Sequence, residues 1–416
     1  MPYEFVVKPQ TITVDQVPCQ GGTKVWPHAT LEYELYGAPL DKKLPVMVIL
    51  PFFLGNAHAG GYAKEDPKTK KLAVPGYWNQ LIGPGNAFDT STHTIISFGP
   101  LIGSHFGPGQ INPTTKAPYG GDFPNFTFDD YAKIQKAALA KLGVTHVHVV
   151  AGASMGSLQA WHMFADDVNF VDKLVLVVPG GEELPEKTRV FADRWVNMLQ
   201  ADPGWKGGNY YPHGYDPSKP GAKYNSSTLV TVLSEFWYRC QYPLAEQMLW
   251  DPQEEYWEEF VRAWIPANPK DDVLIGDAIK AAQASKKSVD EDFNKTLSLV
   301  IKGTDFNVLL WQLRTINSFS VQDRLAEAQN TISSRENPLG VFIVYAPDDD
   351  IFTTASIAKT STTDSLRHVD MRVIKLPPNK AHATGLRDTA LGSVHPQLDA
   401  ALYLFIHGRA KSVAKL

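Results

Sequence analysis

The sequence predicts an α/β fold in which helices flank a mostly parallel central sheet and one large helical segment is inserted. Apolar runs of strand length alternate with helical patterns, and this alternation stops near residue 182 and returns near residue 339. With 416 residues and 44% hydrophobic composition, the chain can bury a large core. We therefore predict a core made of residues 1–181 and 339–416, with a lid formed by residues 182–338.

The first half of the predicted core contains an edge hairpin and one parallel crossover unit. Residues 5–40 suit an antiparallel hairpin, because residues 29–36 alternate as a half-exposed strand does. Residues 46–50 form a fully apolar strand. A capping-box pattern at 127–130 predicts a helix that ends at Gly143 and leads into the next apolar strand.

The junction after that strand is the most informative feature of the chain. Gly152, Ser154 and Gly156 form a G-x-S-x-G pattern between the strand at 147–150 and a helix predicted at 155–165. Such a sharp turn presents a serine hydroxyl as a nucleophile and needs small residues two positions before and after it. We predict that Ser154 is a catalytic nucleophile.

A serine nucleophile needs a histidine base and a carboxylate, which follow it in that order along chains of this architecture. The strand predicted at 340–346 runs directly into three aspartates at 348–350. Asp349 is the preferred acid, because the spacing to the following aliphatic and bulky residues is the usual one, and Asp350 is the alternative. His382, after the strand predicted at 371–376, is the predicted base. The opposing interpretation is a solvated acidic turn with a histidine in a loop.

The remaining requirement is a pair of backbone N–H groups that bind the oxyanion. Met155, directly after the serine, is predicted to supply one donor, and Phe53, in the loop after the strand at 46–50, the other. Phe52 and Phe53 are also candidates for an apolar pocket wall.

Several segments together resemble the homoserine O-acetyltransferase family of α/β-hydrolases, over roughly residues 30–405. The similar segments are residues 81–90, 107–113, 118–124, 154–156 and 201–211. The resemblance implies an α/β-hydrolase fold with a lid, a triad of Ser154, Asp349 and His382, and an oxyanion site at Phe53 and Met155.

Two departures from that family concern recognition of the substrate. Family members that act on homoserine carry a lid arginine for its carboxylate and an aspartate after the catalytic histidine for its ammonium group. This chain has Val196 and Ala383 at the corresponding positions. Without these partners, the buried carboxylate and ammonium groups of homoserine would be unpaired, at a cost of roughly several kcal/mol. Homoserine is therefore a poor substrate candidate. Arg194 would replace the missing arginine only if the alignment were shifted.

The main functional prediction is therefore a serine esterase that acts on small acyl esters of acetyl type, with Phe52, Val196 and Ala383 near the substrate. An acetyl-CoA-dependent O-acyltransferase is the alternative, because the acceptor of the acyl group decides the enzyme class. A non-catalytic ligand-binding homologue is the remote alternative. The expected partner is a small-molecule ester or acyl donor, and an exposed lid surface makes a homodimer plausible.

Composition narrows the classes of partner and compartment. A net charge of −5 without a basic patch argues against nucleic acid and anionic membranes. No apolar run of about 18 residues and no signal peptide is evident, which predicts a cytoplasmic protein, or a periplasmic or secreted one if the start is trimmed. Cys19 and Cys240 could be free thiols or one bridge. No metal or cofactor site is predicted.

Overall fold

The computed structural model describes residues 5–65, 72–212, 215, 226–241, 303–361, 366, 369–376, 382, 385 and 395–408. Its strands are β1 (Gln10–Cys19), β2 (Lys24–Gly37), β3 (Val46–Leu50), β4 (Tyr62–Glu65), β5 (Leu72–Pro75), β6 (Thr94–Phe98), β7 (Val147–Ala153), β8 (Val171–Val177), β9 (Gly340–Tyr345) and β10 (Asp370–Lys375). Its α-helices are α1 (Phe128–Lys141), α2 (Met155–Asp166), α3 (Glu186–Ala201), α4 (Ser227–Gln241), α9 (Phe306–Asn317), α10 (Gln322–Ser333), α11 (Thr354–Ser361) and α13 (His395–His407). Short 3-10 helices are η1 (Leu40–Lys42), η2 (Gly120–Asp122) and η3 (Pro203–Gly208).

Eight strands form one sheet in the order β1-β2-β6-β3-β7-β8-β9-β10. The first hairpin is antiparallel, and β2 also pairs antiparallel with β6, whereas every later pair is parallel. The carboxyl ends of β3, β7, β8, β9 and β10 therefore meet at one edge of the sheet, which is where open α/β sheets bind ligands.

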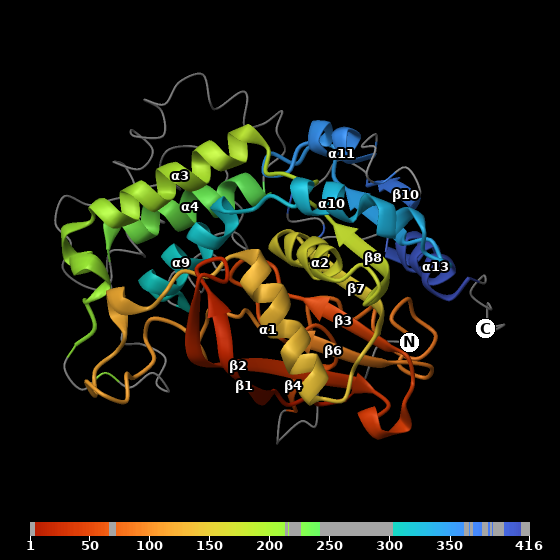
Figure 1. The fold of residues 1–416 in the computed structure, drawn as a ribbon, viewed down its shortest axis with the longest axis horizontal. Helices are drawn as coiled ribbons and strands as arrows, with labels where there is room; N and C mark the ends of the chain where they lie inside the picture. Colours follow the sequence, from red (N-terminus) through yellow and green to blue (C-terminus); the bar gives the residue numbers. More distant parts are fainter. Residues whose placement is uncertain are drawn as a thin grey trace.

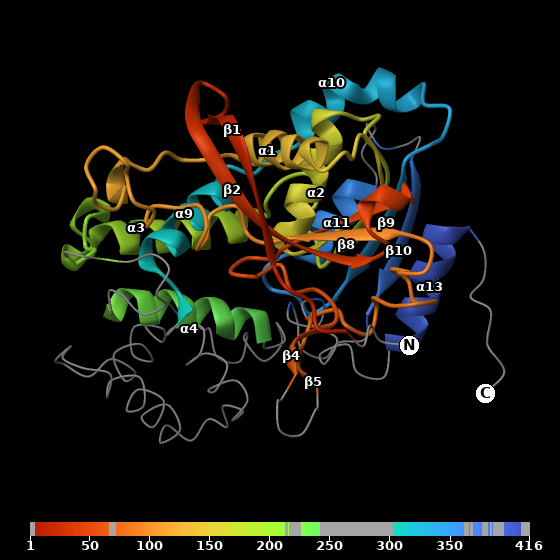
Figure 2. The same cartoon turned by 90° about the horizontal axis from the view of Figure 1, so that it is seen from below.

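Side chains of each central strand alternate between two buried layers. Val48 and Leu50 of β3 pack toward α1 and α2, whereas Met47 and Ile49 pack toward Trp78 and the C-terminal helix α13. Figures 1 and 2 show these helices on opposite faces of the sheet. Because both faces are covered, the central strands are apolar throughout, as parallel strands usually are.

The predicted mostly parallel α/β-hydrolase architecture is confirmed. The capping box that starts α1 is present, since the Asp130 amide donates to the Thr127 hydroxyl (3.3 Å) and the Thr127 amide donates to the Asp130 carboxylate (2.9 Å). Strand β6, the small hairpin of β4 and β5, and helices α11 and α13 were not predicted. Strand β6 is as short as β3, but Thr94 and Ser97 interrupt it, so it lacks the continuous apolar run that predicts β3.

The described residues of the segment predicted as a lid are mainly helical. Helices α3, α4 and α9 lie together beside the carboxyl edge of the sheet (Figure 1), and α3 contacts both of the others. Helix α10 instead packs on the core helix α2, and Arg324 on α10 binds Asp129 on α1 at 2.7 Å. The described part of this segment thus lies both beside the carboxyl edge of the sheet and on the outer layer of the core.

Two further predictions concern the cysteines and membrane segments. Cys19 and Cys240 are both buried free thiols, so the alternative of a bridge between them is wrong. Within the part of the chain that the structure describes, no helix is long and apolar enough to cross a bilayer.

Candidate active site

Ser154 stands at a tight turn between β7 and α2. Its backbone has φ 53° and ψ −122°, a conformation that residues other than glycine rarely adopt. A Cβ atom at Gly152 would lie 2.2 Å from the Gly156 carbonyl carbon, and one at Gly156 would lie 2.3 Å from the Leu50 carbonyl oxygen. Both glycines are therefore required sterically, for the reason that the sequence pattern indicates.

Three predicted side chains meet in one hydrogen-bonded chain. The Ser154 hydroxyl oxygen lies 2.7 Å from Nε2 of His382, and Nδ1 of His382 lies 2.7 Å from a carboxylate oxygen of Asp349. All three residues are buried. They follow β7, β10 and β9 at the carboxyl edge of the sheet, so the topology brings together residues that are far apart in sequence. This is the arrangement that serine nucleophiles use for proton transfer.

The two adjacent aspartates have different partners. The second carboxylate oxygen of Asp349 accepts hydrogen bonds from the backbone N–H groups of Ile351 (2.8 Å) and Phe352 (3.0 Å), which fix its orientation toward His382. Asp350 instead binds Arg239 at 2.7 Å and also contacts the Lys187 ammonium group. The geometry therefore favours Asp349 over Asp350 as the acid of the triad.

The backbone N–H groups of Met155 and Phe53 have no hydrogen-bond acceptor among the residues that the structure describes. Met155 is the first residue of α2, where N–H groups lack intrahelical partners and the helix dipole favours negative charge. Leu54 follows Phe53 in the loop after β3, and its backbone N–H donates a hydrogen bond of 3.1 Å to the side-chain oxygen of Gln312 on α9. Gln312 was not predicted, because nothing in the sequence links α9 to a loop more than 250 residues earlier.

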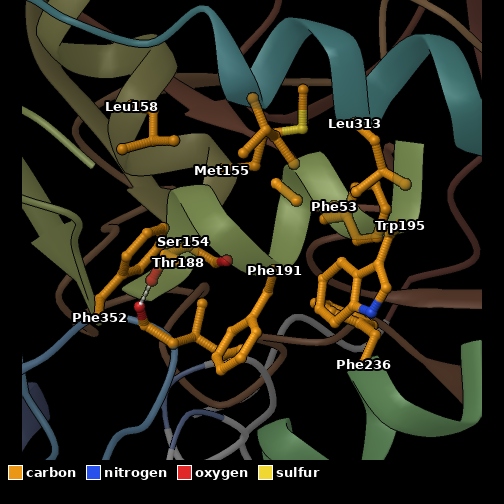
Figure 3. A pocket seen from close by; sticks show the side chains of 13 residues that line it. Phe53, Ser154, Met155, Leu158, Thr188, Phe191, Trp195, Phe236, Leu313 and Phe352 are labelled. Atoms are coloured by element: carbon orange, nitrogen blue, oxygen red, sulfur yellow. Dashed lines mark hydrogen bonds between the residues drawn. The ribbon is translucent and has the colours of Figure 1, made fainter. Parts of the chain in front are cut away.

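Ser154 opens into a small apolar cavity of about 30 Å³ (Figure 3). The lining residues are Phe53, Ser154, Met155, Leu158, Thr188, Phe191, Ala192, Trp195, Phe236, Leu313, Ile316, Ile351 and Phe352. Helices α3, α4 and α9 supply one side of this lining. Because one water molecule needs about 10–15 Å³, the cavity has room for roughly two or three groups of that size.

The predicted pocket residues lie in different places. Phe53 lines the cavity, but Phe52 points into the other core layer and packs edge-on against Tyr77, with ring centroids 5.1 Å apart. Val196 is half-buried on α3 and is not among the residues that line this cavity. Ala383 lies outside the described residues.

An ionic network that sequence analysis missed stands behind the cavity. Glu235 on α4 accepts hydrogen bonds from Arg239 (3.1 Å) and from Arg194, and Arg239 continues to Asp350. Glu235, Arg239 and Asp350 are almost completely buried. Only the i, i+4 spacing of Glu235 and Arg239 on α4 could have indicated part of it. The guanidinium group of Arg194 is engaged in this network.

The chain is similar in sequence to acyltransferases. Residues 76–234 match the α/β hydrolase fold family. A homoserine O-acetyltransferase from Methanosphaera stadtmanae is 35% identical over 208 residues, which cover 49% of this chain and 41% of the relative. A homoserine O-succinyltransferase from Magnetococcus marinus is 31% identical over 249 residues, which cover 58% and 61%. The chain thus spans about half the length of the curated relatives it matches.

Solved structures share the fold over nearly the whole chain. A crystal structure of an esterase has a TM-score of 0.70 at 22% identity, covering 96% of this chain and 100% of the other. A homoserine O-acetyltransferase from Bacillus anthracis has a TM-score of 0.71 at 21% identity, covering 98% and 99%. At these identities the similarity supports the fold alone.

Proposed function

We propose that Ser154 takes up an acyl group of acetyl size and passes it to a hydroxyl acceptor, since the chain has an α/β-hydrolase fold and is similar in sequence to homoserine O-acetyltransferases. The observation that carries the proposal is the position of the His382 imidazole, which lies 2.7 Å from both the Ser154 hydroxyl and the Asp349 carboxylate. The apolar cavity at Ser154 would receive the acyl group.

In the first half of the reaction, the acyl donor binds with its carbonyl carbon against the Ser154 oxygen. His382 takes the hydroxyl proton as the oxygen attacks, and the Met155 and Phe53 N–H groups stabilise the oxyanion that forms. Asp349 holds the imidazole in the tautomer whose Nε2 is free to accept that proton, and it stabilises the resulting imidazolium. His382 then protonates the leaving group as its bond to the carbonyl carbon breaks.

In the second half, the acceptor hydroxyl group takes the place of the leaving group. His382 removes the proton of the acceptor as the acceptor oxygen attacks the acyl carbon, and a second oxyanion forms in the same site. The bond between Ser154 and the acyl carbon then breaks as His382 gives that proton to the serine oxygen. The lid helices over the cavity limit access of water, so the fit of the acceptor decides between transfer and hydrolysis.

We give an O-acetyltransferase first place, because the sequence relatives are named as O-acyltransferases of homoserine. The main prediction from sequence, an esterase, has less support from those names and becomes the second candidate. It is favoured by one specific observation: Val196 replaces the lid arginine of the family, and Arg194 is bound to Glu235 and is not free for a substrate carboxylate. A neutral acceptor, an alcohol or water, therefore suits the described residues better than homoserine.

The test separates acyl uptake from acceptor choice. The enzyme is acylated with p-nitrophenyl acetate or acetyl-CoA and then challenged with homoserine, with a neutral alcohol, or with water alone. The proposal predicts a burst of p-nitrophenol and an acetylated enzyme. Accumulation of an acetylated alcohol indicates the transferase, whereas acetate as sole product with every acceptor indicates the esterase. An enzyme that forms no acyl intermediate from either donor would refute the proposal.

A further inference from the structure

The proposed function leaves open what limits the size of the acyl group. We propose that Trp195 is the residue that sets this limit, because it closes the end of the acyl cavity and is held there by a buried carboxylate. The inference rests on the proposed function, since it concerns the acyl group carried by Ser154. It adds a specificity-determining residue outside the triad and the oxyanion site.

Trp195 faces the nucleophile across the cavity. In Figure 3, Ser154 and Phe352 lie on one side, whereas Trp195 and Phe236 lie on the other. The ring of Trp195 packs edge-on against Phe236 with centroids 5.9 Å apart, and Phe236 packs edge-on against Phe53 at 4.8 Å. Because the cavity is small, an acyl chain that extends from Ser154 across it meets this aromatic wall after a few atoms.

The indole ring is fixed as well as packed. Its Nε1 donates a hydrogen bond of 2.7 Å to Glu235, on the neighbouring helix α4. The residue as a whole is only 4% exposed. Rotation of the ring to admit a longer chain would leave the indole N–H and one oxygen of a buried carboxylate without partners, which is unfavourable in a buried site. Trp195 therefore blocks the cavity from a fixed position, which is set jointly by its own helix α3 and by Glu235 on α4.

The carboxylate is itself anchored to the core. Glu235 is bound by Arg239, whose guanidinium group also lies 3.7 Å from the centroid of the Phe191 ring. Phe191 forms another part of the cavity wall. Arg239 in turn binds Asp350, the residue next to the Asp349 that contacts His382. One buried network thus positions two wall residues relative to the loop that carries the triad acid.

The charges of this network lie behind the wall and are satisfied by one another. Among the described residues, the lining itself offers two hydroxyl groups, those of Ser154 and Thr188, and no charged side chain. A dicarboxylic acyl group such as succinyl would bring an unpaired carboxylate into this cavity, which is strongly unfavourable. The wall is therefore expected to discriminate against charge as well as length.

The test compares p-nitrophenyl esters of two, four, six and eight carbons, with kcat/KM measured for each. Wild-type protein is expected to prefer acetate. Trp195→Ala should raise the ratio of six-carbon to two-carbon kcat/KM by roughly tenfold or more, since each methylene group that a hydrophobic pocket accommodates is worth about 10-fold or more in discrimination. Trp195→Phe, which keeps most of the ring volume, should restore most of the wild-type preference.

Controls separate this role from damage to the fold. Val190→Ala changes an exposed residue of the same helix α3, which does not line the cavity, and should leave the ratio unchanged. Phe236→Ala enlarges the same end of the cavity from α4 and should also raise the ratio. It therefore tests the inference even if Trp195→Ala does not fold. A general loss of packing would lower all activities together and leave the ratio constant. A ratio within about threefold of wild type in the enlarged variants, with acetate turnover retained, would overturn the inference but not the proposed function. Absence of acetate turnover in wild-type protein would overturn the proposed function itself.

Discussion

Two adjacent aspartates illustrate how much depends on single residues in this site. Asp349 accepts two backbone hydrogen bonds and contacts His382, whereas Asp350 is paired with cations from the lid segment. One carboxylate thus contacts His382, and its neighbour ties α3 and α4 to the loop that carries both. The difference arises from side-chain direction, which the composition of the acidic run does not specify.

Replacement of the two aspartates by asparagine should separate these roles. Asp349→Asn favours the wrong tautomer of His382 and should lower kcat for p-nitrophenyl acetate by about 10⁴-fold. Asp350→Asn removes a partner from Arg239 and should mainly lower the free energy of unfolding, by about 3 kcal/mol. Steady-state kinetics and urea denaturation of both variants measure the two effects. A larger loss of kcat in Asp350→Asn than in Asp349→Asn would move the triad acid by one residue.

The turn at the nucleophile makes a second prediction at this scale. Gly152→Ala places a Cβ atom 2.2 Å from the backbone of Gly156, so the turn must open and Ser154 must move away from His382. Activity should fall at least about 100-fold, because small displacements of reacting groups have effects of that size. The matched control is Gly303→Ala, where a Cβ atom would meet nothing within 4 Å. Equal activities of the two variants would contradict this account of the turn.

At this scale, much of the site could be predicted from the sequence. Ser154, His382 and Asp349 follow strand-like runs in a fixed order, and the glycines around Ser154 reflect a local steric need. Gln312 and Glu235 could not be predicted, because their partners are distant in sequence and their residue types are common on helix surfaces. What contacts them depends on how the lid segment docks.

At the scale of elements, helix α4, in the segment predicted as a lid, is joined through Arg239 to the loop after β9. This side chain is 3% exposed and lies between Glu235 and Asp350. Removal of one partner from a buried ion pair leaves the other charge without compensation, which costs more than the pair itself contributes. The position of α4, and with it the aromatic wall of the cavity, therefore depends on this arginine.

Arg239→Met should lower the free energy of unfolding by about 3–5 kcal/mol. The matched control is Arg372→Met on β10, whose partner Asp370 and whose own side chain are about half exposed. Exposed pairs contribute about 0–1 kcal/mol, so the control should change little. Chemical denaturation of both variants tests the difference. Similar small losses in both would show that the buried network does not anchor α4.

Elements were predicted in proportion to the length and regularity of their pattern. Strand β7 and helix α2 were predicted from an apolar run followed by a helical period, and α1 from its capping box. Helix α13 was missed, although its residues Leu398, Leu402, Phe405 and Ile406 fill the second core layer. The sequence before α13 contains no strand pattern, and the apolar residues of α13 do not mark where the helix begins.

At the scale of the whole molecule, a cluster of three histidines around the buried His93 lies at the amino ends of β6 and β7 and the end of α13, opposite the sheet edge that carries Ser154. The ring of His93 on the segment before β6 stacks on His148 of β7 at 5.5 Å and packs edge-on against His407 at 5.2 Å. Burial, reinforced by these two neighbouring histidines, lowers the pKa of His93 to about 4. The folded protein therefore keeps this side chain neutral where an unfolded chain would protonate it.

This shift predicts a pH dependence of folding stability with a defined sign. The unfolded state binds a proton at His93 below about pH 6.5, whereas the folded state does so only near pH 4. The contribution of His93 is therefore fully present above about pH 6.5 and is lost as the pH falls to about 4. Near pH 5 it should add a slope of up to about 1.4 kcal/mol per pH unit. Urea denaturation between pH 4 and 7 should show a flatter profile in His93→Gln, and an unchanged slope would contradict the prediction.

The whole-molecule architecture was predicted well because a mostly parallel sheet needs long apolar strands with intervening helices. The arrangement of the lid segment was not, since helices α3, α4 and α9 find their places through tertiary contacts. The size and apolar character of the acyl cavity follow from those contacts, and so they could be described only from the structure.

The central claim is that Ser154 carries the acyl group during turnover. The most direct measurement is mass spectrometry of protein quenched during reaction with p-nitrophenyl acetate, followed by peptide mapping. We predict one added acetyl group, located on Ser154 and absent from the Ser154→Ala variant, which should also lack turnover. Acetylation at another residue that accounts for turnover, or full turnover by Ser154→Ala, would contradict the account.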